Sequence, residues 1–293
     1  MLTKTHVSAV GLIGGSIAKA LTESGASVSV WDRDPSIREL AVAAGLVCLP
    51  ARESNADLFV IGAPISAVPE MVTQIKAELA DKTCREPLLI DVASVQFDSS
   101  GRYFSTHPLA GRADSGFANS DANLFLGATW AVPAHKANHL PTTRPRLAAE
   151  LSAGLIQEEQ DLRLIKEWVS SLGALPVSID AVEHNRAVAS YSHLVQILAS
   201  ALAGSTHRHD QAGLILSGPA FRDATRVAAS APEMWQEIFK ANQAEVSRSL
   251  RDLITELQSW QRAVDNQDSV QIAELIGLGN QARADLVARR WPE

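Results

Sequence analysis

Two polar residues stand directly after predicted buried strands, Ser94 after 88–92 and His107 after 103–106. Ligands of open α/β sheets bind beyond the carboxyl ends of the strands, so both side chains are placed where a reaction can occur. Pro108 disfavours an α-helical backbone at His107 and holds it extended, which fixes the direction of the ring. The sequence therefore predicts an imidazole proton acceptor at this edge, with a structural histidine at a strand end as the alternative interpretation.

A second group of candidate residues lies in the last third of the chain. His193, Arg222 and Arg226 are positive or ionisable groups set among apolar neighbours, and the two arginines are one helical turn apart. A guanidinium presents a fork of donors that fits a carboxylate. Asp223 precedes Arg226 by three residues, so an exposed ion pair within one helix is the alternative. Arg226 is followed by apolar residues, which favours a carboxylate-binding role.

The scaffold that would hold these side chains is clearest near the N-terminus. An apolar strand at 7–10 leads into a glycine-rich turn, and Ile13, Ile17 and Leu21 then recur every four residues, as in a helix laid on a sheet. A helix N-terminus offers unpaired N–H groups, and glycines let a pyrophosphate approach the backbone. The pattern predicts a dinucleotide-binding turn made of Gly11, Leu12, Ile13, Gly14, Gly15 and Ser16.

The turn departs from the G-x-G-x-x-G pattern at its first position. Ala9 stands where the pattern has a glycine, followed by Gly11 and Gly14. Alanine fits this position only if its φ is negative, so we expect a negative φ at Ala9. A turn used only for helix–strand packing is the alternative to nucleotide binding.

An acidic residue ends the next predicted strand. The strand at 27–31 is followed by Asp32, whose carboxylate can accept hydrogen bonds from both ribose hydroxyls and repels a 2′-phosphate. This favours NAD over NADP. Arg33 could pair with the 2′-phosphate, so NADP remains an alternative cofactor. The predicted cofactor-binding residues are completed by Asp32, Arg33, and, after the strand at 57–61, Ala63 and Pro64.

Composition excludes several classes of protein. The net charge of −7 argues against nucleic acid or an anionic membrane as a partner, and no uninterrupted apolar run reaches membrane-spanning length. Cys48 and Cys84 have no histidine at metal spacing, so we expect no metal site and a reducing compartment. These features predict a cytoplasmic protein.

The first part of the chain, 1–180, alternates short strands with helices, which predicts an α/β domain of the Rossmann type with a parallel sheet. Its predicted strands also include 129–132 and, as the last, 175–179. A polar, proline-containing loop is expected at 134–146. The predicted helices are 35–44, 68–79 and 161–172.

Residues 181–293 lack strand signals and are expected to form an all-α domain. The predicted helices are 181–203, 219–229, 232–264 and 269–290, the third beginning with a proline in its first turn. A small helical domain cannot bury the apolar stripe of so long a helix by itself. We therefore expect a homodimer.

Five short motifs follow one another in a fixed order: Gly11-Leu-Ile-Gly-Gly-Ser16, Asp91-Val-Ala-Ser-Val95, His107-Pro-Leu-Ala-Gly111, Ser192-His193-Leu194, and Phe221-Arg-Asp-Ala-Thr-Arg226 continuing to Trp235. A chain with these motifs resembles the prephenate/arogenate dehydrogenase family of tyrosine biosynthesis. The resemblance implies an N-terminal nucleotide-binding domain, a C-terminal helical domain for substrate binding and dimerisation, and an oxidative decarboxylation with hydride transfer to NAD(P).

The resemblance also implies roles for single residues. His107 would accept the proton of the substrate's 4-hydroxyl group, and Ser94 would orient His107 and the nicotinamide. Arg226 would bind a substrate carboxylate. The remaining substrate-binding residues would be His193, Gln196, Trp235 and Arg222.

Three positions depart from the pattern of many family members. Those members have lysine at Gln96, histidine at Gln196 and an acidic residue near Ala113. Each departure removes a charge or a donor from the predicted pocket. The substrate preference is therefore left open.

Prephenate with NAD is the leading interpretation, and arogenate is the nearest alternative because it differs only in an amino group that replaces a keto oxygen. A dehydrogenase that does not decarboxylate its substrate is a second alternative. A module that binds NAD without turnover is a third.

Overall fold

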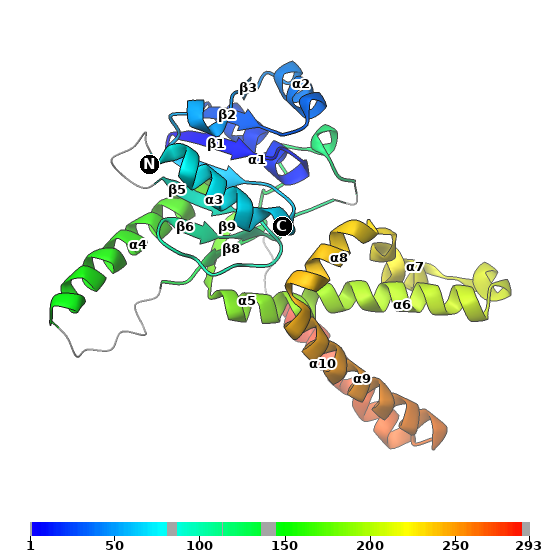
Figure 1. Ribbon diagram of the computed structural model, residues 1–293. Helices are drawn as coiled ribbons and strands as arrows, with labels where there is room; N and C mark the ends of the chain where they lie inside the picture. Colours follow the sequence, from blue (N-terminus) through cyan, green and yellow to red (C-terminus); the bar gives the residue numbers. More distant parts are fainter. Residues whose placement is uncertain (1, 81–86, 113, 136–144, 289–293) are drawn as a thin grey trace. The chain divides into compact units, whose positions relative to one another are not determined.

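The computed structural model describes residues 2–80, 87–112, 114–135 and 145–288, with the backbone alone described at 145–153 (Figure 1). The chain forms two compact units, Met1–Asn185 with Arg226–Ala241, and Arg186–Thr225 with Asn242–Glu293. The segment Arg226–Ala241, which the sequence places with the helical half, packs with the first unit. The reason is a set of apolar contacts between Trp235, Ile238, Phe239 and the cluster that includes Ile65 and Val68.

A six-stranded parallel sheet forms the centre of the first unit, in the order β3-β2-β1-β4-β5-β6. This order is the doubly wound arrangement that the sequence predicted. The first strand begins and ends earlier than the predicted 7–10, because the chain leaves the sheet at Ala9. The strands are β1 (Lys4–Ser8), β2 (Ser27–Trp31), β3 (Val47–Cys48), β4 (Leu58–Ile61), β5 (Leu88–Asp91) and β6 (Tyr103–Ser105).

Both faces of the sheet are buried, which explains the continuous apolar runs of its central strands. Along β4, Leu58 and Val60 join one core cluster, whereas Phe59 and Ile61 join the other. Helices α1 (Leu12–Glu23) and α4 (Pro145–Ser171) contribute to the first cluster, and α3 (Val68–Leu79) contributes to the second. Helix α2 (Pro35–Ala43) follows β2 and ends before Gly45, whose φ is 83°.

A second sheet was not foreseen in the sequence. It has the order β7-β8-β9, from β7 (His107–Pro108), β8 (Thr129–Pro133) and β9 (Leu175–Ile179), with β7 antiparallel to β8. The break between β6 and β7 falls at Thr106, whose Oγ1 donates to the Asp91 carbonyl and accepts from Trp130 Nε1. These bonds turn the chain from one sheet to the other, so His107 begins the new sheet.

Helix α4 is much longer than predicted. It begins at Pro145 instead of Asp161, because the intervening residues are mostly alanine, leucine, glutamate and glutamine, which favour a helix. The predicted loop at 134–146 lies largely outside the described residues, since 136–144 are not described.

The chain after β9 is helical, and it belongs to the second unit except for 180–185 and Arg226–Ala241. Helix α5 (Ala181–Val188) leads into a π-helical turn at Ala189–His193 and then into α6 (Leu194–His209). The predicted helix at 219–229 is α7 (Pro219–Thr225) followed by a 3-10 turn. The predicted helix at 232–264 is two helices, α8 (Pro232–Ala241) and α9 (Gln243–Asp265), because the backbone at Asn242 leaves the helical conformation. Helix α10 (Ser269–Ala288) completes the unit.

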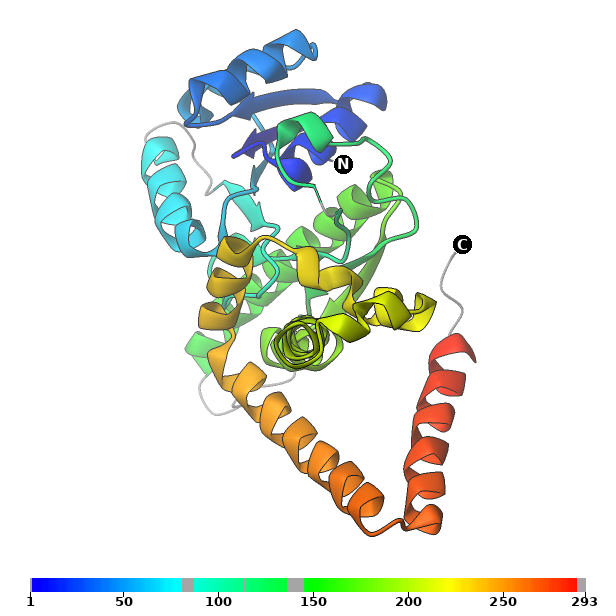
Figure 2. The same ribbon diagram turned by 90° about the vertical axis from the view of Figure 1, so that its right-hand side faces the viewer.

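Apolar side chains of the second unit are widely exposed. Helix α10 has no buried residue, and Figure 2 shows α9 and α10 diverging from the turn that joins them. The predicted stripe of α5–α6 is exposed at Tyr191, Val195, Leu198 and Leu202. The run Ala181–His209 is also long and apolar enough to cross a membrane by length and composition alone, a test that core helices of other proteins pass as well.

Candidate active site

The glycine-rich turn is shaped by the main chain of Ala9. Its φ is +65°, so the predicted negative φ is wrong. In this conformation the Ala9 carbonyl oxygen lies against the Cα atoms of Gly14 and Gly62, and a Cβ at either position would come closer to it than real Cβ atoms do. Tertiary contacts therefore hold an alanine in the left-handed region, and two glycines make room for its carbonyl group.

Besides Gly14, two more of the six predicted turn residues, Gly15 and Ser16, are used in packing. The Cα of Gly15 lies against Phe117 and Ser120, and Ser16 Oγ donates to the Leu12 carbonyl at 2.7 Å and accepts from the Asp121 N–H at 2.9 Å. Gly11 is the N-cap of α1 and provides no side chain to cap it. The half-buried residues at the start of α1 are therefore better placed for an anion: Gly11, Leu12 and Ile13.

Asp32 is held beside this turn. Its Oδ2 accepts the Val10 N–H at 2.9 Å and its Oδ1 accepts the Asp34 N–H at 2.9 Å. Each oxygen retains a second lone pair, so the carboxylate can still accept a ribose hydroxyl. The Arg33 side chain is exposed.

Parallel strands bring several predicted residues to one edge of the sheet. Strands β1, β4, β5 and β6 are neighbours, so their carboxyl ends lie at the same edge. The glycine-rich turn follows β1, the half-buried Ala63 and the exposed Pro64 follow β4, and Ser94 follows β5. His107 comes two residues after the end of β6, so the first unit collects these candidates at one edge.

The turn that carries Ser94 is fixed by Asp91, which is fully buried. Asp91 Oδ1 accepts the Ala93 N–H at 2.8 Å and its Oδ2 accepts the Tyr103 hydroxyl at 2.6 Å. Burial raises the pKa of Asp91 to about 6, against the opposing effect of these hydrogen bonds. Ser94 itself is half-buried, and among the described residues its hydroxyl has no hydrogen-bond partner.

His107 contacts His184, and the orienting role expected of Ser94 stays a prediction. The half-buried His107 ring places Nδ1 3.0 Å from His184 Nε2, and the two rings meet edge to face. His184 Nδ1 in turn lies 2.9 Å from Oδ1 of Asn185. The physical reason is the change of sheet at Thr106, after which His107 lies on β7, within reach of α5.

Gln96 belongs to the same group of residues. Its main chain exchanges two hydrogen bonds with Asn185, and its side-chain Nε2 donates to the Ala131 carbonyl at 3.4 Å. Gln96 is buried, and its Oε1 has no hydrogen-bond partner. Ala131 is the register partner of His107 across β7 and β8, so this departure from the family pattern lies beside the candidate acceptor.

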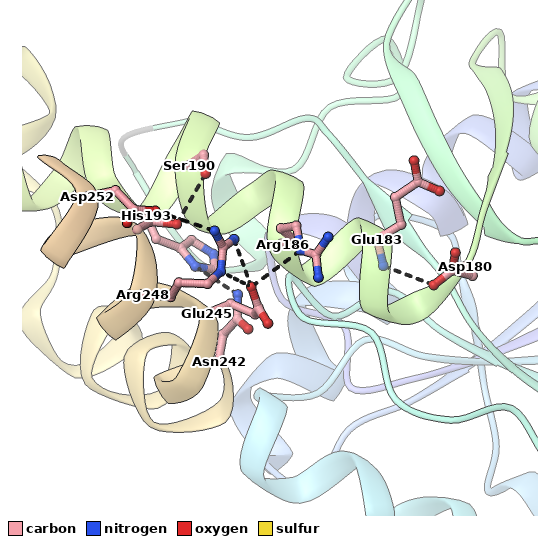
Figure 3. Close-up of polar contacts among 10 residues, drawn as sticks. Asp180, Glu183, Arg186, Ser190, His193, Asn242, Glu245, Arg248 and Asp252 are labelled. Atoms are coloured by element: carbon pink, nitrogen blue, oxygen red, sulfur yellow. Dashed lines mark hydrogen bonds and ion pairs between the residues drawn. The ribbon is translucent and has the colours of Figure 1, made fainter.

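Within the second unit, His193 is buried at the end of the π-helical turn. Asn242 Nδ2 lies 3.3 Å from its Nδ1, and both side chains are labelled in Figure 3. The break between α8 and α9 provides this contact, because a continuous helix would not place Asn242 at a helix end. The nearby Gln196 is buried, with Nε2 3.1 Å from Ser200 Oγ and with no partner for its Oε1.

The remaining predicted substrate-binding residues are Arg222, Arg226 and Trp235, and none of them is fully buried. Arg222 lies on α7 and Arg226 begins the next turn, and both are exposed. Among the described residues Arg226 forms no ion pair with Asp223, so the predicted alternative is wrong. Trp235 is half-buried on α8 and stacks with Phe239 at 5.4 Å between ring centres. Ala113 lies outside the described residues.

The sequence analysis missed four residues of this region: Gly62, His184, Asn185 and Asn242. His184 and Asn185 carry a signal that could have found them, since they are polar residues close behind the last predicted strand. Gly62 and Asn242 carry no local signal, because contacts with distant residues give them their roles. Over the described part of the chain, no group of three or more histidine, cysteine or acidic residues could hold a metal ion.

Comparisons with known proteins identify the family of the chain. Residues 17–142 match the family model described as the nucleotide-binding domain of prephenate dehydrogenase, and residues 180–278 match the model of its dimerization domain. A prephenate dehydrogenase of Bacillus subtilis is 25% identical, over 97% of this chain and 76% of that protein. A cyclohexadienyl dehydrogenase of Zymomonas mobilis is 26% identical, over 96% of each chain.

A solved structure shares the fold. The prephenate dehydrogenase of Aquifex aeolicus, in complex with hydroxyphenyl propionate and NAD+, has a TM-score of 0.80 with 21% identity. The alignment covers 98% of this chain and 99% of that one.

Proposed function

The chain belongs to the prephenate dehydrogenase family, and from this premise we propose that it oxidatively decarboxylates prephenate to 4-hydroxyphenylpyruvate with NAD, in tyrosine biosynthesis. The observation that carries the proposal is the shared edge of the parallel sheet, where an open helix N-terminus and His107 both lie. The first fits a dinucleotide and the second fits the removal of a proton.

The residues present fit a dinucleotide. Gly11, Leu12 and Ile13 would hold its pyrophosphate at the N-terminus of α1, with Asp32 at the adenosine ribose. Ala63 and Pro64 border the same edge. When bound, NAD accepts a hydride from the ring carbon that bears the 4-hydroxyl group. NAD is the proposed cofactor over NADP because the Asp32 carboxylate repels a 2′-phosphate.

In the proposed mechanism His107 accepts the proton of the 4-hydroxyl group as that carbon loses its hydride. The ring carboxylate then leaves as CO2 and the ring becomes aromatic. Arg226 pairs with a substrate carboxylate, and Ser94 contacts substrate or nicotinamide with the hydroxyl that its own chain leaves available. His193, Gln196, Trp235 and Arg222 line the substrate site.

We also propose a homodimer formed by the second unit. The exposed apolar residues of α6 and the absence of buried residues on α10 support it, because such surfaces are covered by a partner in stable proteins. The proposed domains are a nucleotide-binding domain at 1–180 and a domain for substrate binding and dimerisation at 181–293. A cytoplasmic location fits the two cysteines and the reducing compartment they indicate.

Arogenate is the second candidate substrate. One observation favours keeping it: Gln96 and Gln196 replace charged or ionisable side chains of many family members, and both have a buried oxygen without a partner. The ammonium group of arogenate could donate a hydrogen bond to such an oxygen.

The test is an assay of the purified protein with prephenate and with arogenate, each with NAD and with NADP, reading reduced cofactor, CO2 and product. Prephenate with NAD is expected to give the highest kcat/KM. Reduction without CO2 would identify a dehydrogenase that does not decarboxylate, and tight NAD binding without turnover of either substrate would identify a sensing module.

A further inference from the structure

The side chain of Asn185 is fixed by the main chain of Gln96. Asn185 Nδ2 donates to the Gln96 carbonyl oxygen at 2.9 Å, and its Oδ1 accepts the Gln96 N–H at 2.9 Å. Since the Gln96 N–H can only donate and the Gln96 carbonyl oxygen can only accept, one orientation of the Asn185 amide satisfies both bonds. Asn185 Oδ1 is therefore the atom that faces His184.

This orientation determines which nitrogen of His184 carries hydrogen. His184 Nδ1 lies 2.9 Å from Asn185 Oδ1, which can only accept, so Nδ1 must donate. His184 is 2% exposed, and burial lowers its pKa, against a smaller opposing effect of the bond to Asn185. In the neutral ring Nε2 then carries a lone pair.

The tautomer of His184 in turn determines which nitrogen of His107 carries hydrogen. His184 Nε2 and His107 Nδ1 lie 3.0 Å apart, so a lone pair on the first requires hydrogen on the second. A neutral His107 with hydrogen on Nδ1 carries its own lone pair on Nε2. Nε2 is the nitrogen able to take a proton.

We infer that Asn185 and His184 are positioning residues, which set the tautomer of His107 so that its Nε2 takes the proton of the substrate hydroxyl. In that step the O–H bond breaks, an N–H bond forms at Nε2, and the His107 imidazolium keeps its Nδ1–H bond to His184. The proton is not passed on through His184 to Asn185, because the amide oxygen of Asn185 is a poor base. The catalytic part rests on the proposed function, whereas the tautomer does not.

The first experiment reads the tautomers directly, without turnover. The full-length protein is labelled with 15N-histidine, and two-bond 15N–1H correlation spectra are recorded near pH 8, with His107→Gln and His184→Gln spectra used for assignment. Both rings are expected to have hydrogen on Nδ1 and none on Nε2. Hydrogen on Nε2 of either neutral ring would overturn the inference.

The second experiment compares two replacements of His184. In His184→Gln the Oε1 atom can accept from His107 Nδ1 as Nε2 did, so kcat is expected within about fivefold of the parent. His184→Leu fills the space without an acceptor, and kcat is expected to fall about 10–100-fold with KM for NAD little changed. If His184 only fills space, leucine would serve as well as glutamine, and that result would overturn the inference.

A matched variant, Glu183→Gln, serves as the control for both experiments. Glu183→Gln changes an exposed neighbour on the same helix and is expected to alter neither spectra nor kcat. If the tautomers are as inferred but neither substrate is oxidised, the proposed function fails and the positioning of His107 stands. If prephenate is oxidised but His107 has hydrogen on Nε2, the function stands and the inference fails.

Discussion

The two units of the chain differ in how completely their helices are buried. In the first unit both faces of the sheet are covered, and buried polar groups such as Asp91, His184 and Thr106 have hydrogen-bond partners. In the second unit large apolar side chains are exposed, among them Leu198, and α10 has no buried residue. From this contrast we expect the first unit to hold the proposed reacting groups in place by itself, and the second unit to depend on a partner copy.

The sharpest test of the first half of this contrast removes the proposed proton acceptor. His107→Asn is expected to lower kcat about 10²–10⁴-fold, because general base catalysis contributes a factor of that size. NAD affinity, measured by fluorescence titration, should change little, since His107 is not among the residues proposed to hold the nucleotide. Unchanged turnover would remove His107 from the mechanism.

A buried ion pair tests whether the first unit is held by its own interactions. Arg102 Nε and Nη2 donate to the two oxygens of Asp161 at 2.8 and 2.7 Å, and the Asp161 side chain is 1% exposed. Arg102→Ala leaves a buried carboxylate without its counter-charge and should lower the free energy of unfolding by about 3–5 kcal/mol in urea. Arg163→Ala removes one side of the exposed pair with Glu167 and should cost less than about 1 kcal/mol. Equal losses would show that burial does not set the strength of these pairs.

The exposed Arg226 tests the proposed binding of a substrate carboxylate. Arg226→Ala is expected to weaken substrate binding by about 2–5 kcal/mol, seen as a higher KM, if its guanidinium pairs with a substrate carboxylate in a covered site. Arg163→Ala serves again as the charge control. A KM within about twofold of the parent would return Arg226 to the role of a surface residue.

Leu198 tests the dependence of the second unit on a partner. Leu198→Glu places a charge on the exposed apolar stripe of α6 and should weaken self-association on the order of 100-fold, because each of two copies loses a buried leucine. Sedimentation velocity at micromolar concentration would show the shift. Leu40→Glu on α2 changes a leucine of similar exposure in the first unit and should leave the oligomer intact. The same shift in both variants would contradict the proposed location of the interface.

His6 offers a pH test confined to the first unit. It is fully buried, with Nδ1 2.9 Å from Ser29 Oγ and Nε2 3.1 Å from Ser8 Oγ, and burial lowers its pKa from 6.5 to about 4. The unfolded chain therefore binds more protons between these pH values, so the contribution of His6 is full above pH 6.5 and is lost as pH falls toward 4. The lost stability is about 3 kcal/mol.

Asp91 acts in the opposite direction, because its raised pKa makes stability fall as pH rises from 3.8 to about 6. The measurement is therefore a difference. The free energy of unfolding of the parent minus that of His6→Gln should rise by about 3 kcal/mol from pH 4 to 6.5, since the Asp91 contribution cancels. A difference that does not change with pH would contradict the assignment to His6.

The sequence predicted best those elements whose identity lies in local patterns. Strand β2 and helix α3 have the predicted bounds, because alternation or a four-residue repeat ends at clear turn signals. The break at Asn242 was missed because the apolar periodicity continues across it. The positive φ of Ala9 could not be predicted, since Gly14 and Gly62 create the space for its carbonyl group.

The candidate site divides in the same way. Its motif residues, such as His107 and Asp32, could be found from type and spacing. His184 could have been singled out as a polar residue behind the last predicted strand, but its pairing with His107 could not be predicted, because it lies 77 residues further along the chain and reaches His107 only through the second sheet. The role expected of Ser94 from the family pattern stays a prediction, whereas the change of sheet at Thr106 brings His184 within reach of His107.

The most direct test of the account is a single-turnover reaction of the protein with NAD and prephenate carrying 13C in its ring carboxylate. We expect one labelled CO2 and one 4-hydroxyphenylpyruvate for each NADH formed. In His107→Asn the rates at which these three products form are expected to fall together. NADH without labelled CO2, or equal rates in the parent and His107→Asn, would contradict the account.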